Sequence, residues 1–380
     1  MSLRLAALLL CGRAASAWAQ AAIDPTRYPD LLRYLDPQPD ETQFACEISP
    51  IPPSLNFSFR FGAGYIVRVP MGQFRGPDHR WDTVVEVVPR TGGKPFYFGR
   101  RILLPDVPVT RASAEFGGGY LLGEGQYRAR LAMMDERRRV CRKQWTIEVK
   151  PRYSERRVRT RMPPNSIAEL TWENVAAGSR DSDEAPKGKL TLLLNVAPLS
   201  PRRLRLRPTD RLVLLTLVSA VLESFPAHRV RLVAFSLDQQ KELFVRDTLA
   251  AGDLQKLEEA LEGLELATVD YHVLQDAGGY RTLLGNLAGR ELRASPPPDT
   301  VLFLGPAVRY QGKVPPAALE GIDDPASRVF YLRYRPPFRR PVPDLPDIID
   351  ALISRLKGKR FVIRTPADFQ KAIQRLSDGR

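Results

Sequence analysis

Lys189-Leu-Thr-Leu-Leu-Leu-Asn195-Val-Ala197-Pro-Leu199-Ser200 is the stretch that decides the fold of this 380-residue chain. Its first half is an almost unbroken apolar run, which is typical of a strand buried on both faces of a parallel sheet. From this point to residue 380, strand-like apolar runs alternate with helix-like ones. That alternation predicts a doubly wound α/β domain over residues 189–380.

The elements of this C-terminal domain can be placed from their hydrophobic patterns and end signals. A helix over residues 209–225 is apolar on nearly every face and must therefore be buried, and Pro226 ends it. Asp253 is a good N-cap for an amphipathic helix, and Thr365 caps a last helix. Further strands are predicted at residues 229–236, 241–245, 300–304, 328–332 and 360–363, and a further helix at residues 346–356.

The order and spacing of these elements resemble the plan of a von Willebrand factor A domain. Three passages carry the resemblance: the long buried helix and strand of residues 212–236, the strand, loop and helix of residues 243–264, and the glycine-led strand and capped helix of residues 358–376. In that family the first strand ends in D-x-S-x-S, whose carboxylate and hydroxyls hold a divalent cation. The matching positions here are Asn195, Ala197 and Leu199.

The other metal-binding positions that the resemblance implies are equally altered. Thr282 is the best match for the family's later threonine, and Gly305 stands where an aspartate is expected. Hard cations need several oxygen ligands, usually with a carboxylate among them. The resemblance therefore implies a degenerate A domain that holds neither a metal ion nor another cofactor.

Residues 45–150 have the pattern of an immunoglobulin-like β-sandwich, because short strand-like runs follow one another with Gly/Pro turns between them. The alternating stretch Leu55–Phe61 is predicted as one of these strands, and Gly117-Gly118-Gly119 as one of the turns. Residues 20–44 are expected to form an N-terminal arm with a short helix near residues 29–35. Residues 151–188 are expected to be a linker.

Residues 1–19 have the features of a signal peptide. Arg4 supplies the positive start, a short apolar run follows, and Ala17-Trp18-Ala19 is an A-x-A cleavage pattern. The alternative is a lipoprotein signal in which Cys11 is acylated. No later stretch is long and apolar enough to span a bilayer, so the mature chain is expected to be periplasmic or extracellular.

Removal of this segment would leave Cys46 and Cys141 as a single pair in an oxidising compartment, and a disulfide between them is predicted. The alternative is two separate buried thiols.

The formal net charge of +14 indicates a surface that attracts anionic partners. No finger, helix-turn-helix or aromatic-basic RNA signature accompanies the charge, so no nucleic acid is expected. For an exported chain, an acidic protein or an anionic envelope polymer is the expected partner.

Motifs of catalysis are missing from the sequence. It has no H-E-x-x-H, no C-x-x-C, no G-x-S-x-G and no Walker loop. The favoured hypothesis is therefore an exported, non-catalytic interaction or adhesion-type protein. The alternatives are an enzyme that acts on envelope polymers with carboxylates that the sequence does not reveal, and a structural or assembly factor of the envelope.

Ligands of doubly wound sheets bind beyond the carboxyl ends of the strands. Here these ends are expected in residues 195–207, 278–282 and 305–310. The candidate partner-binding residues are Arg202, Arg203, Arg205 and Arg207, which follow the first strand.

Overall fold

The computed structural model describes residues 20–104, 106–171, 174, 188–199, 206–225, 228–262, 264, 276, 278–322, 324–336 and 346–377. The chain divides into two compact units. The first unit comprises residues 1–55, 60–152 and 160–170, and the second comprises residues 56–59, 153–159 and 171–380.

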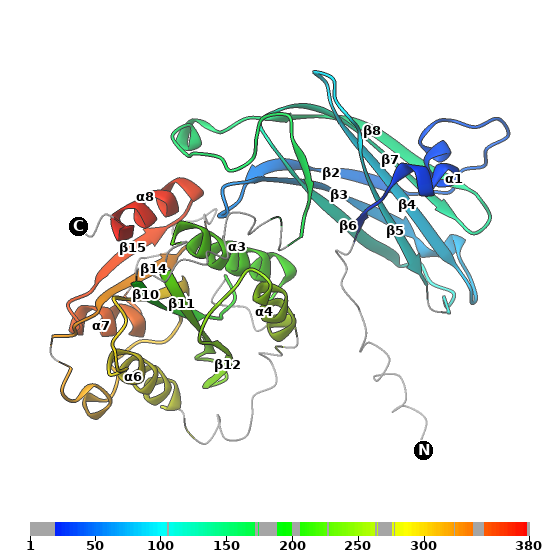
Figure 1. Cartoon of the computed structure of the whole chain (residues 1–380). Helices are drawn as coiled ribbons and strands as arrows, with labels where there is room; N and C mark the ends of the chain where they lie inside the picture. Colours follow the sequence, from blue (N-terminus) through cyan, green and yellow to red (C-terminus); the bar gives the residue numbers. More distant parts are fainter. Residues whose placement is uncertain are drawn as a thin grey trace, which may run out of the picture. The chain divides into compact units, whose positions relative to one another are not determined.

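The first unit contains two antiparallel sheets (Figure 1). The five-stranded sheet has the order β1 (Ala21–Ala22), β5 (Phe96–Leu103), β4 (Arg80–Pro89), β7 (Gly125–Asp135) and β8 (Val140–Val149). The four-stranded sheet has the order β2 (Glu47–Leu55), β3 (Phe61–Pro70), β6 (Ser113–Leu122) and β9 (Ile167–Glu169). Short helical turns are η1 (Pro25–Arg27), α1 (Pro29–Leu32), η2 (Arg33–Leu35) and η3 (Met71–Gln73).

Aromatic side chains fill the space between these two sheets. Trp81 on β4 is only 1% exposed, and its ring lies 5.8 Å from that of Phe116 on β6. Phe98 on β5 stacks on Tyr120 of β6 at 5.6 Å. Burying rings of this size gives the unit its largest apolar contributions. The predicted β-rich N-terminal region is thereby confirmed.

The stretch Leu55–Phe61 is not one strand, as its alternation predicts. β2 ends at Leu55, β3 starts at Phe61, and the residues between them form a turn in which Phe59 has a φ of 58°. The Ser58 hydroxyl donates to the Asn56 side chain at 2.8 Å, a local bond that favours a turn over a strand. Phe57 and Phe59 are therefore buried without being in a sheet.

The Gly117-Gly118-Gly119 run was expected to be a turn, and this prediction is wrong. The run lies inside β6, paired with Ile66, Tyr65 and Gly64 of β3. A Cβ at Gly118 would lie 2.0 Å from the Gln20 side-chain oxygen and 2.5 Å from the Tyr65 hydroxyl. The missing side chain of Gly118 leaves space for these two neighbours. A glycine run is also typical of turns, which is why the sequence predicted one here.

β2 contains three prolines, Pro50, Pro52 and Pro53, and it is an edge strand. Pro52 and Pro53 lie where its register with β3 is irregular, between Ile51 and Ser54, so they interrupt no regular pairing.

The predicted disulfide is confirmed. Cys46 immediately precedes β2 and Cys141 lies in β8, and their Cα atoms are 6.2 Å apart. The bridge links edge strands of the two sheets and closes a chain separation of 95 residues.

The second unit is built on one six-stranded, mostly parallel sheet. Its order is β12 (Lys241–Arg246), β11 (His228–Ser236), β10 (Gly188–Asn195), β13 (Thr300–Pro306), β14 (Arg328–Tyr334) and β15 (Lys359–Ile363). Only the edge pair β11–β12 is antiparallel. The coarse prediction of an α/β-like C-terminal part is therefore confirmed.

Helices cover both faces of this sheet (Figure 1). The helices are α3 (Pro208–Ser224), α4 (Asp253–Glu262), α6 (Gly279–Leu292), α7 (Ile348–Arg355) and α8 (Pro366–Ser377), with 3-10 turns η4 (Tyr153–Glu155) and η5 (Pro316–Leu319). Leu284 of α6 and Ile349 of α7 share a buried cluster with Leu193 of β10. Because side chains alternate along a strand, Leu192 and Leu194 face the opposite side, where Figure 1 shows α3 and α8.

Among the described residues, no helix is both long enough and apolar enough to cross a lipid bilayer.

Candidate functional site

The carboxyl ends of the parallel strands meet at one edge of the six-stranded sheet. β10 ends at Asn195, β11 at Ser236 and β13 at Pro306. Open α/β sheets bind their ligands at this edge, because the loops that leave the strands there diverge to opposite faces. The candidate site therefore lies at this edge.

Asn195 is the central residue of this edge and is only 1% exposed. Its Nδ2 donates to the carbonyl oxygen of Pro306 at 3.1 Å, which ties the end of β10 to the end of β13. Its Oδ1 is buried and has no hydrogen-bond partner among the residues that the structure describes. An unpaired buried acceptor is costly, and Asn195 borders a small pocket of about 10 Å³, the size of one water molecule.

Gly305, the position matched to the family's aspartate, is closed to any side chain. Its φ is 147°, and a Cβ there would lie 2.5 Å from the backbone oxygen of Asn195. Only glycine tolerates both conditions. With the backbone of β13 in this conformation, an aspartate cannot replace Gly305.

The remaining predicted metal positions do not converge on one point. Ala197 borders the small pocket with its methyl group, and Leu199 is half-buried. Thr282 lies exposed in the first turn of α6 and is not among the residues that line the pocket. Within the described ranges, no group of three or more His, Cys, Asp or Glu side chains is arranged to hold a metal ion. That the unit binds no metal remains a prediction.

An acid–arginine–tyrosine cluster occupies the same edge. The Asp238 Oδ1 accepts hydrogen bonds from Arg309 Nη2 and from the Tyr310 hydroxyl, each at 2.7 Å. The Tyr310 ring stacks on Tyr280 of α6 at 4.3 Å. We call Asp238, Arg309 and Tyr310 the edge clamp. The loop of Arg309 and Tyr310 was predicted to border the site, whereas no signal marked Asp238.

The electrostatics of the edge clamp keep the arginine charged. The hydrogen bond with Tyr310 and the charge of Asp238 raise the pKa of Arg309 against the opposing effect of burial. Burial raises the pKa of the Tyr310 phenol, and the Asp238 carboxylate adds to that rise. The Arg309 side chain is still 48% exposed. The clamp thus presents a fixed guanidinium at the carboxyl edge.

The four candidate arginines can be located only in part. Arg202, Arg203 and Arg205 lie outside the described residues. Arg207 is exposed immediately before α3, and its backbone N–H donates to Asp210 Oδ2 at 2.9 Å. Asp210 is 1% exposed, and its carboxylate caps the first turn of α3 by accepting this bond. The role of these arginines in partner binding stays a prediction.

The pair of acids that most resembles a catalytic dyad is Asp347 and Asp350. Burial raises the pKa of Asp347, and the charge of Asp350 raises it further. Each carboxylate, however, accepts the backbone N–H of the other at 2.9 Å, and Arg333 Nη1 donates to Asp350 at 2.8 Å. Neither acid lines either of the described pockets. The pair caps α7 and holds the start of that helix in place.

No protein-family model and no curated protein matches this chain. Among solved structures, it is similar over 29% of its length to OgpA from Akkermansia muciniphila, with 14% identity, 30% of that chain covered and a TM-score of 0.19. It is also similar over 29% of its length to a putative ApaA protein from Bordetella pertussis, with 14% identity, 97% of that chain covered and a TM-score of 0.20. A β-glucuronidase from Bacteroides uniformis is similar over 82% of this chain and 38% of its own, with 11% identity and a TM-score of 0.20.

These likenesses are too weak to identify a family. The chain spans less than a third of OgpA.

Proposed function

We propose that this chain is an exported, non-catalytic interaction protein. Its second unit is a von Willebrand A-type domain without a metal site, which recognises acidic side chains of a protein partner at its carboxyl edge. Its first unit is an immunoglobulin-like module.

Two neighbouring features carry the proposal. One is the edge clamp, and the other is Gly305, the predicted metal position that has no room for a side chain. The space at Gly305 is taken by the Asn195 backbone, while Arg309 is held nearby at the same edge by Asp238 and Tyr310. A guanidinium presents a rigid fork of N–H donors that matches a carboxylate in two hydrogen bonds. Arg309 can thus attract a carboxylate without a cation.

Preorganisation strengthens this role. A free arginine loses side-chain freedom when it binds, which weakens the interaction. The hydrogen bonds of Arg309 to Asp238 and to Tyr310 (3.2 Å), and the stacking of Tyr310 on Tyr280, already restrict it. The exposed half of its side chain remains open to a partner.

The immunoglobulin-like description of the first unit is supported by a corner contact. The Tyr127 hydroxyl donates to the backbone oxygen of Gly123, four residues upstream, at 2.8 Å. Such a tyrosine corner is a hallmark of that sandwich architecture. Export is supported by the disulfide, since such bridges persist in oxidising compartments.

The test is capture of acidic proteins from the envelope fraction of the source cells, with and without a chelator. The proposal expects capture to survive the chelator and to fall about tenfold in Arg309→Gln, the usual effect of losing one charged hydrogen-bonded contact. Arg246→Gln is the matched control, because Arg246 is 40% exposed, is ion-paired with Asp253, and lies opposite Leu232, four residues before the carboxyl end of β11. Capture that needs the divalent cation, or that Arg309→Gln leaves intact, contradicts the proposal.

A further inference from the structure

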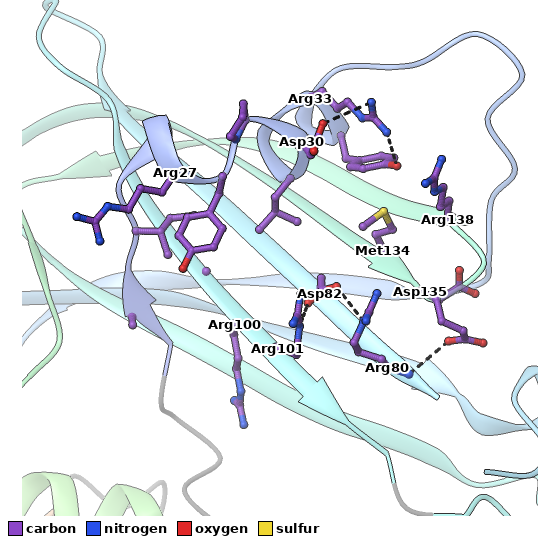
Figure 2. A pocket seen from close by; sticks show the side chains of 18 residues that line it. Arg27, Asp30, Arg33, Arg80, Asp82, Arg100, Arg101, Met134, Asp135 and Arg138 are labelled. Carbon is purple, nitrogen blue, oxygen red and sulfur yellow. Dashed lines mark hydrogen bonds and ion pairs between the residues drawn. The ribbon is translucent and has the colours of Figure 1, made fainter. Parts of the chain in front are cut away.

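The first unit contains a large hollow under its N-terminal arm, with a volume of about 970 Å³ (Figure 2). One wall is the arm with η1, α1 and the start of η2. The other is formed by β4, β5 and the end of β7. The volume lies within the range of ligand-binding pockets. We call this feature the arm hollow.

The arm that covers the hollow is anchored at both ends. β1 pairs with β5 through Ala21 and Ala22, and Tyr34 packs in a buried cluster with Val84 of β4. Beyond it, Asp36 forms an ion pair with Arg130 of β7 at 2.6 Å. The wall that the arm contributes to the hollow is therefore held in place by specific contacts with the sheet.

The floor of the hollow carries more arginine than its carboxylates neutralise. Arg101 Nε lies 2.7 Å from one oxygen of Asp82, and Arg80 Nε lies 3.2 Å from the other (Figure 2). Two guanidiniums thus share a single carboxylate. The side chains of Arg80 and Arg101 are 43% and 63% exposed, so both keep donors available to a ligand.

The acids at the rim are already engaged. Asp135 accepts from Arg139 Nε at 2.6 Å and from backbone amides of the same turn. Glu136 accepts from buried His79 at 2.9 Å. Arg138, which also lines the hollow, forms no ion pair within the part of the chain that the structure describes. The surplus charge facing the hollow is positive.

An aromatic surface accompanies these charges. Tyr28 lines the hollow and is 49% exposed, so its ring is accessible to a ligand. The face of an aromatic ring carries partial negative charge and packs against the weakly positive C–H face of a sugar ring. Guanidinium forks beside such a ring match a sugar that bears carboxylates.

We propose that the arm hollow binds a carboxylated oligosaccharide, with Arg80, Arg101 and Arg138 receiving its carboxylates and Tyr28 packing on a sugar face. This site belongs to the first unit and is independent of the edge clamp. It assigns the first unit a ligand-binding role of its own.

The test is titration calorimetry of the purified chain with hexagalacturonate. The same oligosaccharide with every carboxylate methyl-esterified keeps the sugar and removes the charge, and hexaglutamate keeps the charge and removes the sugar. The inference expects hexagalacturonate to bind at least about tenfold more tightly than either comparison probe. Equal binding of the ester, equal binding of hexaglutamate, or no binding of hexagalacturonate overturns it.

Variants locate the binding. Arg138→Gln removes a guanidinium without breaking an ion pair of the described residues. Arg101→Gln removes one of the two guanidiniums on Asp82 and leaves Arg80 paired with it. Each variant is expected to weaken hexagalacturonate binding about tenfold. Arg68→Gln is the control, because Arg68 is 55% exposed and ion-paired on β3 of the other sheet. Circular dichroism confirms that each variant is folded. Unchanged binding in both folded pocket variants, or an equal loss in Arg68→Gln, overturns the assignment to this hollow.

Discussion

At the scale of single residues, Gly305 decides what the carboxyl edge of the second unit can hold. Its positive φ and its closeness to the Asn195 backbone leave no room for a side chain. Within the described ranges, the buried Oδ1 of the neighbouring Asn195 has no hydrogen-bond partner. The polar groups beside Gly305 are therefore the backbone and the side-chain amide of Asn195. The charged group at this edge is the guanidinium of Arg309.

Gly305→Ala tests this crowding. The substitution combines a strained φ with a backbone clash at 2.5 Å, and we expect it to lower the free energy of unfolding of the second unit by about 2–4 kcal/mol. Urea unfolding followed by circular dichroism at 222 nm reports on this unit, because the long helices lie in it. Gly252→Ala is the control, since a Cβ there meets nothing within 4 Å. A change equal to that of the control would show that β13 adapts easily.

At the scale of elements, polar side chains fasten strand ends and the arm of the first unit. Arg130 of β7 makes two hydrogen bonds to Glu86 of β4, at 2.6 and 2.9 Å, and also reaches Asp36 of the arm. His79, just before β4, is 6% exposed and contacts Glu136, just after β7. Glu86 and Arg130 are already partners in the β4–β7 ladder, so Arg130 joins Asp36 of the arm to that pair. The His79–Glu136 contact continues the association of the same two strands beyond the Trp81–Asp135 pair.

His79 makes the first unit sensitive to pH. Burial disfavours its charged form, but the Glu136 carboxylate and the Arg75 carbonyl together outweigh burial and the opposing charge of Arg137, so the pKa of His79 is raised. A raised folded-state pKa stabilises the fold fully below the unfolded value of about 6.5, and this contribution is lost as pH rises through the folded value. The unit is therefore expected to lose stability from His79 as pH increases above about 6.5.

Urea unfolding at a series of pH values, followed by tryptophan fluorescence, measures this effect. Wild type is expected to become less stable as pH rises above about 6.5, and His79→Gln to show a flatter profile. The lowered pKa of Glu136 acts in the acidic range and does not interfere. Parallel profiles for the two proteins would contradict this role of His79.

At the scale of the whole molecule, the two units are stabilised in different ways. The first joins two antiparallel sheets through aromatic packing and one disulfide between edge strands. The second buries one mostly parallel sheet under helices on both faces, with no cysteine in residues 171–380. Reducing conditions should therefore affect the two units unequally.

The Cys46→Ser/Cys141→Ser double variant tests this difference. Removing a link across 95 residues frees the unfolded chain, and we expect the first unit to lose about 4 kcal/mol of stability. In a Trp172→Phe background, which removes the tryptophan of the second unit, fluorescence follows the first unit through Trp81 and Trp145. Ellipticity at 222 nm follows the helices of the second unit. An equal fall of both transitions would mean that the units unfold as one.

The periodic elements of this chain could be predicted because their signals are local. The apolar run at residues 190–194, the buried helix after it and the amphipathic spacing of α4 depend only on neighbours a few residues apart. The Cys46–Cys141 bridge followed from cysteine count and compartment. A local pattern was misleading at the Gly117-Gly118-Gly119 run. These glycines lie inside β6 and do not form a turn, and Gly118 leaves space for the side chains of Gln20 and Tyr65.

The sequence by itself determined the class of each half, the course of the main strands and helices, and the identity of the residues at the positions predicted for a metal site, none of which is a carboxylate. Only the tertiary structure decided what stands there instead. Asp238 and Arg309 are 71 residues apart, and Arg130 meets Asp36 across 94. Contacts at such separations depend on the path of the whole chain, because no local periodicity brings those side chains together.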